Sequence, residues 1–508
     1  MAGTSATTPR LSKSRVQSGR QCHKRLWLEL HRRDAAQWSE AAQAVLDAGT
    51  QFGELARELL GGGVLIEADH LHVDDALAET AAALALPRRQ APRLFEAAFS
   101  HRGVRVRVDA LERGRRGDTL VEVKSTASVK DEHLWDCAIQ TWVARGAGRA
   151  IAKVVLAHVD TAFVYQTPGD YRGLLHRVDI TAEVEARLPE IPRLVAELKR
   201  VAAGPMPAIA TGAHCAQPYD CPFFEHCRAA EPPGPEYPVD LLPHAVGVIA
   251  RLLAAGYTDL RKVPTSALPP GRLQRIARVT RTGRAHVSPK LPRLLAAIAY
   301  PRYYLDFETV SFVVPRWPGT RPFQPVPFQF SCHVEQRPGE LAHADFLDLS
   351  GASPLRAFAE CLLATLGTHG PVLVWNRGFE AAPLRDLAAL FPDLADALLG
   401  VAERLLDLLP LYRAHYYHRD MRGSWSIKRV LPTVAPELAY DELAIGDGNA
   451  AQAGYLEAID AATPPQRRAA LHAELSAYCR RDTEAMLRLM TPPAPRRAPR
   501  AAGASPPA

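Results

Sequence analysis

The sequence predicts an α/β protein of several domains, and three observations lead to that prediction. The chain has 508 residues, and at about 150 residues per domain this length predicts about three domains. Strand-like and helix-like segments alternate within residues 104–159 and again from residue 303 to about residue 490, which is typical of α/β folds. Apolar residues make up 47% and charged residues 23% of the chain, so a largely disordered protein is excluded.

Composition also limits the cellular compartments and the kinds of partner that are expected for this protein. No apolar run approaches the ~20 residues that span a membrane, and the N-terminal residues lack the hydrophobic core of a signal peptide. We therefore expect a cytoplasmic protein with no membrane partner. Eight cysteines in 508 residues do not make a disulfide framework. The net charge of +6 is too small to establish a nucleic-acid partner by itself.

The first region contains a helix that ends at a run of three glycines, residues 61–63, followed by a β-hairpin. RVRVDALE (residues 105–112) and TLVEVK (119–124) alternate on either side of GRRGD. Glu122 and Lys124 share a strand face, and a turn near residues 115–116 places Asp109 opposite Glu122, with Cβ atoms about 5 Å apart. Two carboxylates at that distance repel each other unless a cation such as Mg²⁺ lies between them. Lys124 could orient the attacking water and stabilise negative charge on a phosphate, as metal-assisted phosphodiester hydrolysis requires. A surface ion pair is the alternative.

The surroundings of this hairpin carry a family resemblance. A helix predicted at about 131–145 carries Gln140, a strand follows at 153–159, and a helix containing GTQFGELAREL lies upstream. This order resembles the RecB-family nucleases of the PD-(D/E)xK superfamily, which have a restriction-endonuclease-like fold. The resemblance implies that Asp109 and Glu122 bind Mg²⁺ or Mn²⁺, that Lys124 is the catalytic lysine, and that Gln140 contacts phosphate or water.

Four cysteines form a pattern that suits a metal centre. Cys215, Cys221 and Cys227 make a C-x5-C-x5-C run in a Pro-rich segment, and Cys22 lies far upstream. Four thiolates bind either a [4Fe–4S] cluster or Zn²⁺. The plan resembles RecB-like nucleases with an iron–sulfur cluster, which have one Cys before the nuclease core and three after it. The resemblance implies a structural [4Fe–4S] cluster, with Zn²⁺ as the alternative. The remaining cysteines are expected in the core: Cys137, Cys332, Cys361 and Cys479.

Residues 236–298 are expected to form a small basic domain of short helices, because Pro and Gly interrupt this segment repeatedly. Between residues 261 and 300 there are nine Lys or Arg and no Asp or Glu. Arg272, Arg275 and Arg278 recur every three residues and are expected to line one helical face. They predict a path for nucleic acid, and a solvated linker is the alternative. The stretch GYTDLRKVPTSAL is similar to helix-hairpin-helix sequences.

The last region is expected to contain a second acidic centre. Asp306 and Glu308 share a face of the strand YYLDFETV, Glu380 follows another apolar strand, and Tyr478 and Asp482 are four residues apart on a helix. Four acids on three elements suit two-metal phosphoryl transfer, with Tyr478 orienting the attacking water. The set resembles the DnaQ-like DEDD exonucleases of the ribonuclease H-like superfamily, with Glu380 in place of the usual Asp.

The resemblance extends over nearly the whole chain. QCHKRLWL, PYDCPFFEHC, LDFET, WNRGFE and YCRRDT occur in the order found in a bacterial family of predicted RecB-family nucleases, which fuse an iron–sulfur RecB-like domain to a DEDD exonuclease-like domain. GSWSIKRVLP is similar to the same family and makes Lys428 a candidate nucleic-acid contact; an ordinary exposed lysine is the alternative. The implied domains are a PD-(D/E)xK domain at 1–235, a helical linker at 236–298, a ribonuclease H-like domain at 299–490 and a disordered tail at 491–508.

The sequence therefore predicts a metal-dependent nuclease with two catalytic centres that acts on nucleic acid, with DNA as the expected substrate and exonuclease action as the expected mode. DNA repair, processing or defence is the expected setting. The alternative is a nucleic-acid-binding or scaffold protein in which one or both centres are inactive. Two residues keep this alternative open: Glu380 replaces an Asp, and Gly53 stands where many RecB-like nucleases have a His.

Overall fold

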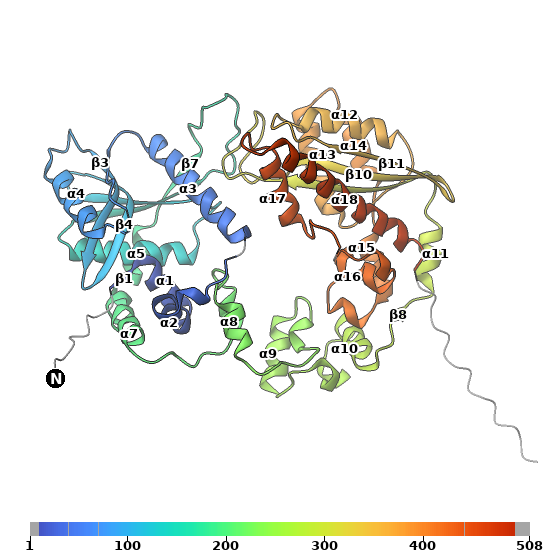
Figure 1. Cartoon of the computed structure of the whole chain (residues 1–508), viewed down its shortest axis with the longest axis horizontal. Coiled ribbons are helices and arrows are strands. Elements are labelled where there is room, and N and C mark those ends of the chain that lie inside the picture. The colour runs from blue at the N-terminus through green and yellow to red at the C-terminus, as the bar shows by residue number, and fades with distance from the viewer. Residues whose placement is uncertain (1–9, 39, 70, 441, 493–508) are drawn as a thin grey trace, which may run out of the picture. The chain divides into compact units, whose positions relative to one another are not determined.

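The computed structural model describes residues 10–38, 40–69, 71–440 and 442–492, and its contacts divide the chain into two compact units. Unit 1 is Met1–Pro232 with Phe312–Gln324, and unit 2 is Pro233–Ser311 with Pro325–Ala508. Both units combine sheets and helices, which confirms the α/β class (Figure 1). The predicted tail at 491–508 lies outside the described residues from residue 493 onward. In the described part of the chain, no helix has the length and apolar character needed to cross a membrane.

Unit 1 contains one seven-stranded sheet in the order β2-β3-β4-β5-β6-β7, with β1 paired to β4. Its strands are β1 (Leu11–Ser12), β2 (Val64–Leu65), β3 (Arg93–His101), β4 (Val104–Glu112), β5 (Asp118–Lys124), β6 (Ile151–Val159) and β7 (Leu175–Asp179). Its helices are α1 (Lys13–Gln21), α2 (His23–His31), α3 (Glu40–Leu60), α4 (Val73–Ala85), α5 (Asp131–Gly146), α6 (Thr181–Arg187), α7 (Ile191–Ala203) and α8 (Phe224–Ala229). Strands β3, β4 and β5 are antiparallel, and α5 connects β5 to the parallel strand β6.

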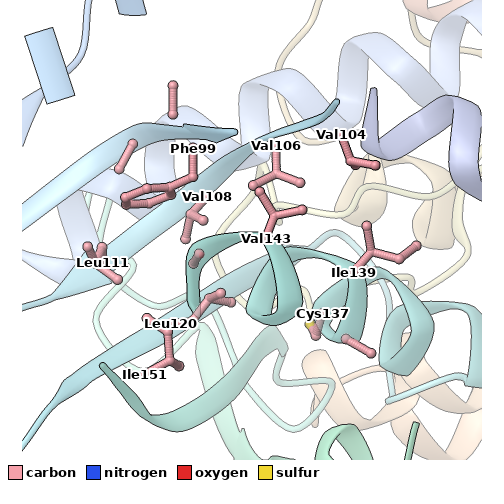
Figure 2. Packing of buried hydrophobic residues seen from close by; sticks show 14 of the residues in the cluster. Phe99, Val104, Val106, Val108, Leu111, Leu120, Cys137, Ile139, Val143 and Ile151 are labelled. Carbon is pink, nitrogen blue, oxygen red and sulfur yellow. The ribbon is translucent and has the colours of Figure 1, made fainter. Parts of the chain in front are cut away.

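The main core of unit 1 lies between the sheet and α5. Figure 2 shows Ile139 and Val143 of α5 beside the apolar side chains of β4 and β5. Leu120 belongs to this core, whereas the next residue, Val121, belongs to a separate cluster on the other face. Because side chains alternate along a strand, Glu122 and Lys124 point to the same face as Leu120, toward α5.

Several predicted boundaries of unit 1 are confirmed. Helix α3 ends at Leu60, and Gly61 then adopts a left-handed φ of 86°, a conformation that glycine allows at a helix end. The helix expected at about 131–145 is α5, and the strand expected at 153–159 is β6, which begins two residues earlier. Asp131 and Glu132 stand in the first turn of α5, where negative charge is favourable.

Unit 2 is built on a five-stranded sheet in the order β11-β10-β9-β12-β13, with a second pair of strands, β14 and β8. Its strands are β8 (His286–Val287), β9 (Arg302–Val310), β10 (Val326–Arg337), β11 (Glu340–Leu347), β12 (Val372–Val374), β13 (Leu405–Asp407) and β14 (Tyr416–Tyr417). Its helices are α9 (Val246–Ala254), α10 (Arg272–Thr282), α11 (Lys290–Ala296), α12 (Leu355–Leu366), α13 (Arg377–Leu390), α14 (Ala395–Arg404), α15 (Leu408–His415), α16 (Ile427–Val430), α17 (Gly448–Ala458) and α18 (Pro465–Leu489). Strands β9, β10 and β11 are antiparallel, whereas β9, β12 and β13 are parallel.

Alternation along β9 separates an apolar face from an acidic one. Phe307 pairs with Phe330 of β10, and both rings meet Phe358 of α12 edge-on at 5.1 and 5.5 Å. Asp306 pairs with Ser331, whose Oγ lies 2.9 Å from Thr483 Oγ1 of α18. The aromatic residues thus pack under α12, while the strand presents its acids to α18 on the other side.

Candidate functional site

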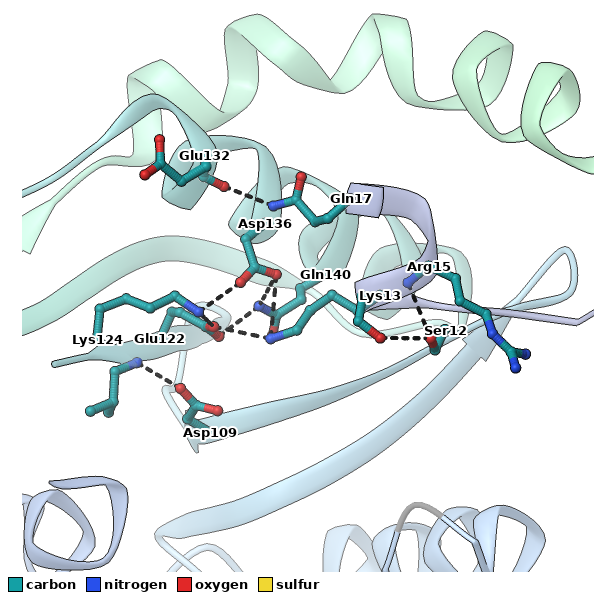
Figure 3. A network of polar contacts seen from close by, with 12 residues as sticks. Ser12, Lys13, Arg15, Gln17, Asp109, Glu122, Lys124, Glu132, Asp136 and Gln140 are labelled. Atoms are coloured by element: carbon teal, nitrogen blue, oxygen red, sulfur yellow. Dashed lines mark hydrogen bonds and ion pairs between the residues drawn. The ribbon is translucent and has the colours of Figure 1, made fainter. Parts of the chain in front are cut away.

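The first candidate site lies at the end of the β4–β5 hairpin, on the face covered by α5 (Figure 3). Ala110 pairs with Val121, which confirms the predicted turn near residues 115–116 and sets Asp109 against Glu122. The backbone N–H of Val123 donates to Asp109 Oδ2 at 2.7 Å, so the carboxylate of Asp109 is tied to the neighbouring strand.

Two residues that the sequence did not predict complete this site: Asp136 of α5 and Lys13 of α1 (Figure 3). Lys124 Nζ lies 2.5 Å from Glu122 Oε1 and 2.8 Å from Asp136 Oδ2. Lys13 Nζ lies 3.0 Å from Glu122 Oε1 and 3.3 Å from Asp136 Oδ1. Both ammonium groups therefore bridge the same two carboxylates.

Gln140 closes the network from one helical turn beyond Asp136. Its Nε2 donates to Glu122 Oε2 at 2.6 Å and to Asp136 Oδ1 at 3.3 Å. Its Oε1 is buried and has no hydrogen-bond partner among the described residues. Since both oxygens of Glu122 accept hydrogen bonds, Gln140 orients the carboxylate of Glu122 and keeps one buried acceptor of its own unsatisfied.

Burial governs the charge states at this site. Glu122 is 1% exposed, and burial, followed by Asp109 and Asp136, raises its pKa to about 7. Burial also raises the pKa of Asp109. Burial pushes the pKa of Asp136 upward too, but Lys124 and Lys13 outweigh it and hold that pKa below its ordinary value. Three carboxyl groups against two ammonium groups leave one formal negative charge, and an all-oxygen set of acids fits a hard divalent cation.

The four cysteines of the predicted metal centre line one pocket in unit 1. Cys22 lies between α1 and α2, Cys227 lies on α8, and Cys215 and Cys221 come from the loop between α7 and α8. The pocket is closed on one side by a small apolar cluster of Leu28, Phe223 and Cys227. The chain therefore brings together residues almost two hundred positions apart, as the sequence pattern requires.

Hydrogen bonds fix this arrangement independently of any ligand. Gln21 Nε2 donates to the carbonyl oxygens of His214 and Tyr219, both at 2.7 Å. The backbone N–H of Cys221 donates to the carbonyl of Cys215 at 2.8 Å. The N-terminal helices are thus joined to the cysteine loop beside the four thiols.

The second candidate site lies in unit 2, between β9 and α18. Asp306, Glu308 and Cys479 each bring a ligand atom within 4.8 Å of the other two. Cys479 is fully buried, as predicted for a core residue, but its Sγ also lies 3.8 Å from the carbonyl oxygen of Asp306 and so borders the acids. Its contact with the acidic strand was not predicted, because Cys479 has no ligand-like spacing to another residue in the sequence.

The two functional candidates on α18 are held by residues from the preceding segment. Tyr440 donates its hydroxyl to Asp482 Oδ1 at 2.5 Å. Lys428 Nζ donates to the hydroxyl of Tyr478 at 2.6 Å and to the carbonyl of Gly446 at 2.9 Å. Because an ammonium group can only donate, the Tyr478 hydroxyl is the acceptor in this contact and keeps its own proton. The structure thus places Lys428 against Tyr478, and it adds Tyr440 to the site.

Burial raises the pKa of every acid of this centre. The pKa values of Asp306 and Glu308 lie well above their ordinary range because of burial and then of the Asp482 charge. Burial raises the pKa of Asp482 to about 6 and that of Glu380 to about 8. Glu380 also contributes to the raised pKa of Asp306, so the two belong to one electrostatic cluster. Glu380 is 1% exposed, and its Oε2 has no hydrogen-bond partner among the described residues. Three buried acids and the half-buried Asp306 make a set of carboxyl groups that fits divalent cations of the Mg²⁺ or Mn²⁺ type.

Asp407, a further acid close to this centre in the fold, has a structural role. Its carboxylate accepts the backbone N–H of Asn376 at 3.0 Å, of Arg377 at 3.1 Å and of Leu409 at 2.9 Å. It is the N-cap of α15 and ties the start of α13 to β13. With these three donors on its oxygens, Asp407 orients the turn that carries Asn376.

The three arginines predicted to line a basic face lie on α10 but do not behave alike. Arg275 is half-buried: its guanidinium donates to the carbonyls of Ala414, at 2.5 Å, and of Arg413. Arg278 is exposed, and Arg272 lines a pocket described below. Burial and the two neighbouring arginines lower the pKa of Arg275. The periodicity therefore predicted the helix, whereas Arg275 contributes mainly to packing.

Comparison with known proteins gives one family match. A family model described as a domain of unknown function (DUF2779) matches residues 303–426, which include Asp306, Glu308 and Glu380. The matched segment covers β9 to the loop before α16. No curated protein matches the chain.

Proposed function

We propose that this chain is a metal-dependent nuclease with two hydrolytic centres, one in each unit, and that its substrate is DNA. The observation that carries the proposal is the centre of unit 2, where the buried residues Glu308, Glu380 and Asp482 cluster with the half-buried Asp306. Clustered buried carboxyl groups are costly unless they are protonated or bind cations. Phosphoryl transfer with two divalent ions is the chemistry that such a set suits best.

The strand orders support the two fold assignments within the α/β class. In unit 2, three antiparallel strands followed by two parallel ones, in the order β11-β10-β9-β12-β13, agree with a ribonuclease H-like sheet. In unit 1, the antiparallel β3-β4-β5 meander followed by α5 and the parallel strand β6 agrees with a PD-(D/E)xK core. Asp109 and Glu122 lie on the adjacent strands β4 and β5, and Asp306 and Glu308 lie on β9, at the centre of its sheet, whereas Glu380 and Asp482 lie on α13 and α18.

At the unit 2 centre, Asp306, Glu308, Glu380 and Asp482 would bind Mg²⁺ or Mn²⁺, which supplies Lewis-acid stabilisation of the phosphate charge when bound. Tyr478 orients the attacking water through its hydroxyl, which Lys428 fixes in place. The hydroxyl of Tyr440 donates a hydrogen bond to Asp482 Oδ1 and so orients the carboxylate of Asp482.

At the unit 1 centre, Asp109 and Glu122 would bind the same kind of ion, and Gln140 holds the Glu122 carboxylate. Lys124 contributes a positive charge to the phosphate and a donor to the attacking water. Lys13 currently shares Glu122 Oε1 with Lys124. A bound cation would compete with these ammonium groups for that oxygen and release a lysine toward the phosphate.

We further propose that Cys22, Cys215, Cys221 and Cys227 bind a structural [4Fe–4S] cluster. The four thiols line one pocket, which supports a shared metal centre, and the resemblance to RecB-like nucleases with an iron–sulfur cluster favours the cluster over zinc. Such a cluster would close a segment of about two hundred residues, and so constrain the unfolded chain. Iron and sulfide analysis of anaerobically purified protein tests this: about four irons per chain with absorption near ~400 nm is expected, and one zinc without iron refutes it.

In a second candidate function, unit 2 cleaves nucleic acid and unit 1 only binds it. The observation in its favour is that two lysines already neutralise Glu122 and Asp136. In that case Lys124 would matter for binding and not for cleavage.

A nuclease panel with Mn²⁺ on single-stranded, double-stranded and 3′- or 5′-labelled DNA distinguishes these functions. We expect Lys124→Ala and Asp306→Ala to lose cleavage of different substrates, each by at least about a hundredfold. The matched controls Lys153→Ala and Asp393→Ala change exposed, ion-paired residues and should cut like the wild type. Loss in Asp306→Ala alone supports the second candidate, and full activity in both variants refutes hydrolysis at these centres.

A further inference from the structure

Unit 2 contains a pocket that neither the acidic centre nor the fold requires. It is bounded by Arg272 of α10, by Trp375 and Asn376 before α13, by Arg413 of α15, and by the segment that leads into α16, which includes Trp425. Its walls therefore come from segments far apart in the sequence. The lining combines two guanidinium groups with two indole rings.

The two guanidinium groups have no acidic partner. Among the ion pairs of the described residues, none involves Arg272 or Arg413, and residues 261–300 contain no Asp or Glu. Arg275 does not line the pocket: it donates to the carbonyls of Ala414 and Arg413 and lies 5.9 Å from the ring of Trp425. Arg272 and Arg413, by contrast, offer uncompensated positive charge to the pocket, which suits a phosphate group.

Hydrogen bonds hold both indole rings, of which Trp425 is buried and Trp375 is half-buried. Trp375 Nε1 donates to the carbonyl of Trp425 at 3.0 Å, and Trp425 Nε1 donates to the carbonyl of Tyr416 at 2.9 Å. Trp375 also contacts the ring of Tyr412, with centroids 5.3 Å apart. With its N–H satisfied, Trp375 has only its π surface left to offer to a ligand, and it is half-buried rather than enclosed. A nucleobase is the planar group that such a ring takes up.

The pocket adjoins the acidic centre through the chain. Asn376 lies one helical turn before Glu380, at the N-cap of α13, where it has a left-handed φ of 85°. Asp407 holds this strained turn by accepting the Asn376 N–H. On the other wall, Ile427 directly precedes Lys428, which contacts Tyr478. Both rims of the pocket thus continue into residues of the acidic centre.

We propose that this pocket binds one nucleotide of a single-stranded nucleic acid, with the phosphate on Arg272 and Arg413 and the base stacked on Trp375. The adjacent nucleotide then lies at the acidic centre. The second statement rests on the proposed nuclease function, whereas the first does not. Asn376, with its exposed amide beside the base, is the residue placed to contact a base edge.

Binding can be measured without cleavage. Anisotropy of a fluorescein-labelled oligo(dT) and oligo(rU), titrated with the full chain in EDTA, compares the wild type with Arg272→Ala/Arg413→Ala, Trp375→Ala and Trp375→Phe. We expect the double variant to weaken binding about tenfold or more and to reduce the salt slope by about 0.7, because the one phosphate that the two arginines hold is no longer neutralised. Trp375→Ala should weaken binding about tenfold, and Trp375→Phe should retain most of it, since it keeps a stacking ring.

The control is Arg337→Ala/Arg356→Ala, which removes two exposed arginines of the same unit that pair with surface acids. It should bind like the wild type with an unchanged salt slope. The proposal is supported if the affinity for oligo(dT) or for oligo(rU) falls in the test variants and not in the control. Wild-type affinity in the double variant and in Trp375→Ala, an equal loss in the control, or no binding by the wild type overturns it. A wild type that binds through the pocket in EDTA but never cuts with Mn²⁺ would refute the nuclease proposal and leave the pocket standing.

Discussion

Replacing Glu380 with Gln should make the stability of unit 2 less sensitive to pH. Burial raises the pKa of Glu380 from 4.5 to about 8, so in the metal-free folded protein this carboxyl keeps its proton where the unfolded chain has lost it. A raised carboxyl pKa stabilises the fold below about pH 4.5, and that contribution is lost as pH rises to about 8. At about 1.4 kcal/mol per pH unit the full difference corresponds to about 5 kcal/mol.

Denaturation by urea in EDTA, followed at about pH 5.5 and about pH 9, measures this effect. We expect the wild type to lose about 2–4 kcal/mol more stability than Glu380→Gln between the two pH values, because water entry on ionisation relieves part of the burial penalty. The Gln amide adds a buried donor that costs a similar amount at both pH values, so it cancels in the comparison. The surface variant Glu360→Gln should follow the wild type. If the wild type and Glu380→Gln lose the same stability between the two pH values, the pKa of Glu380 is not raised by burial and the reasoning is refuted.

Three further changes test the remaining parts of the two units. Lys13→Met leaves Glu122 with one bridging ammonium group and should destabilise unit 1 by about 3–5 kcal/mol in EDTA. Adding Mn²⁺ should recover part of this loss. Thermal unfolding with and without metal measures the effect, and an unchanged Tm contradicts it. Lys428→Met should lower the rate of cleavage by unit 2 about 10- to 100-fold with little change in KM, because Tyr478 loses its positioning contact. A change in KM alone would show instead that Lys428 contacts the substrate. Cys221→Ser should abolish the absorption near ~400 nm and the bound iron, while Cys361→Ser should leave both intact.

Local patterns predicted much of the first site but not its charge balance. The hairpin register followed from alternation and one turn, so Asp109 and Glu122 were correctly predicted to face each other. Asp136 could have been found, since it lies one helical turn before Gln140 on the same face of α5. Lys13 could not, because its contact with Glu122 joins residues 109 positions apart through the packing of α1 against the sheet.

The basic segment shows the opposite limit of pattern reasoning. Spacing of three residues predicted a helix and a common face, and α10 is a helix over these positions. The pattern says nothing about what packs against that face, and there the carbonyls at the end of α15 capture Arg275. The partner that decides a side chain's role comes from a segment more than a hundred residues away, so one arginine becomes structural and its neighbours do not.

The two acidic centres meet the cost of burying carboxyl groups in different ways, and this difference has a consequence for metal binding. In unit 1 two ammonium groups contact Glu122 and Asp136, so an incoming cation competes with lysines and, at Glu122 below about pH 7, with a proton. In unit 2 the acids have raised pKa values and Lys428 donates to a tyrosine rather than to a carboxylate, so an incoming cation competes mainly with protons. Metal binding at unit 2 must therefore release protons and strengthen steeply as pH rises toward 8. At unit 1 the lysines keep their charge throughout that range and Glu122 has a pKa of about 7, so the pH dependence of metal binding should level off above about pH 7.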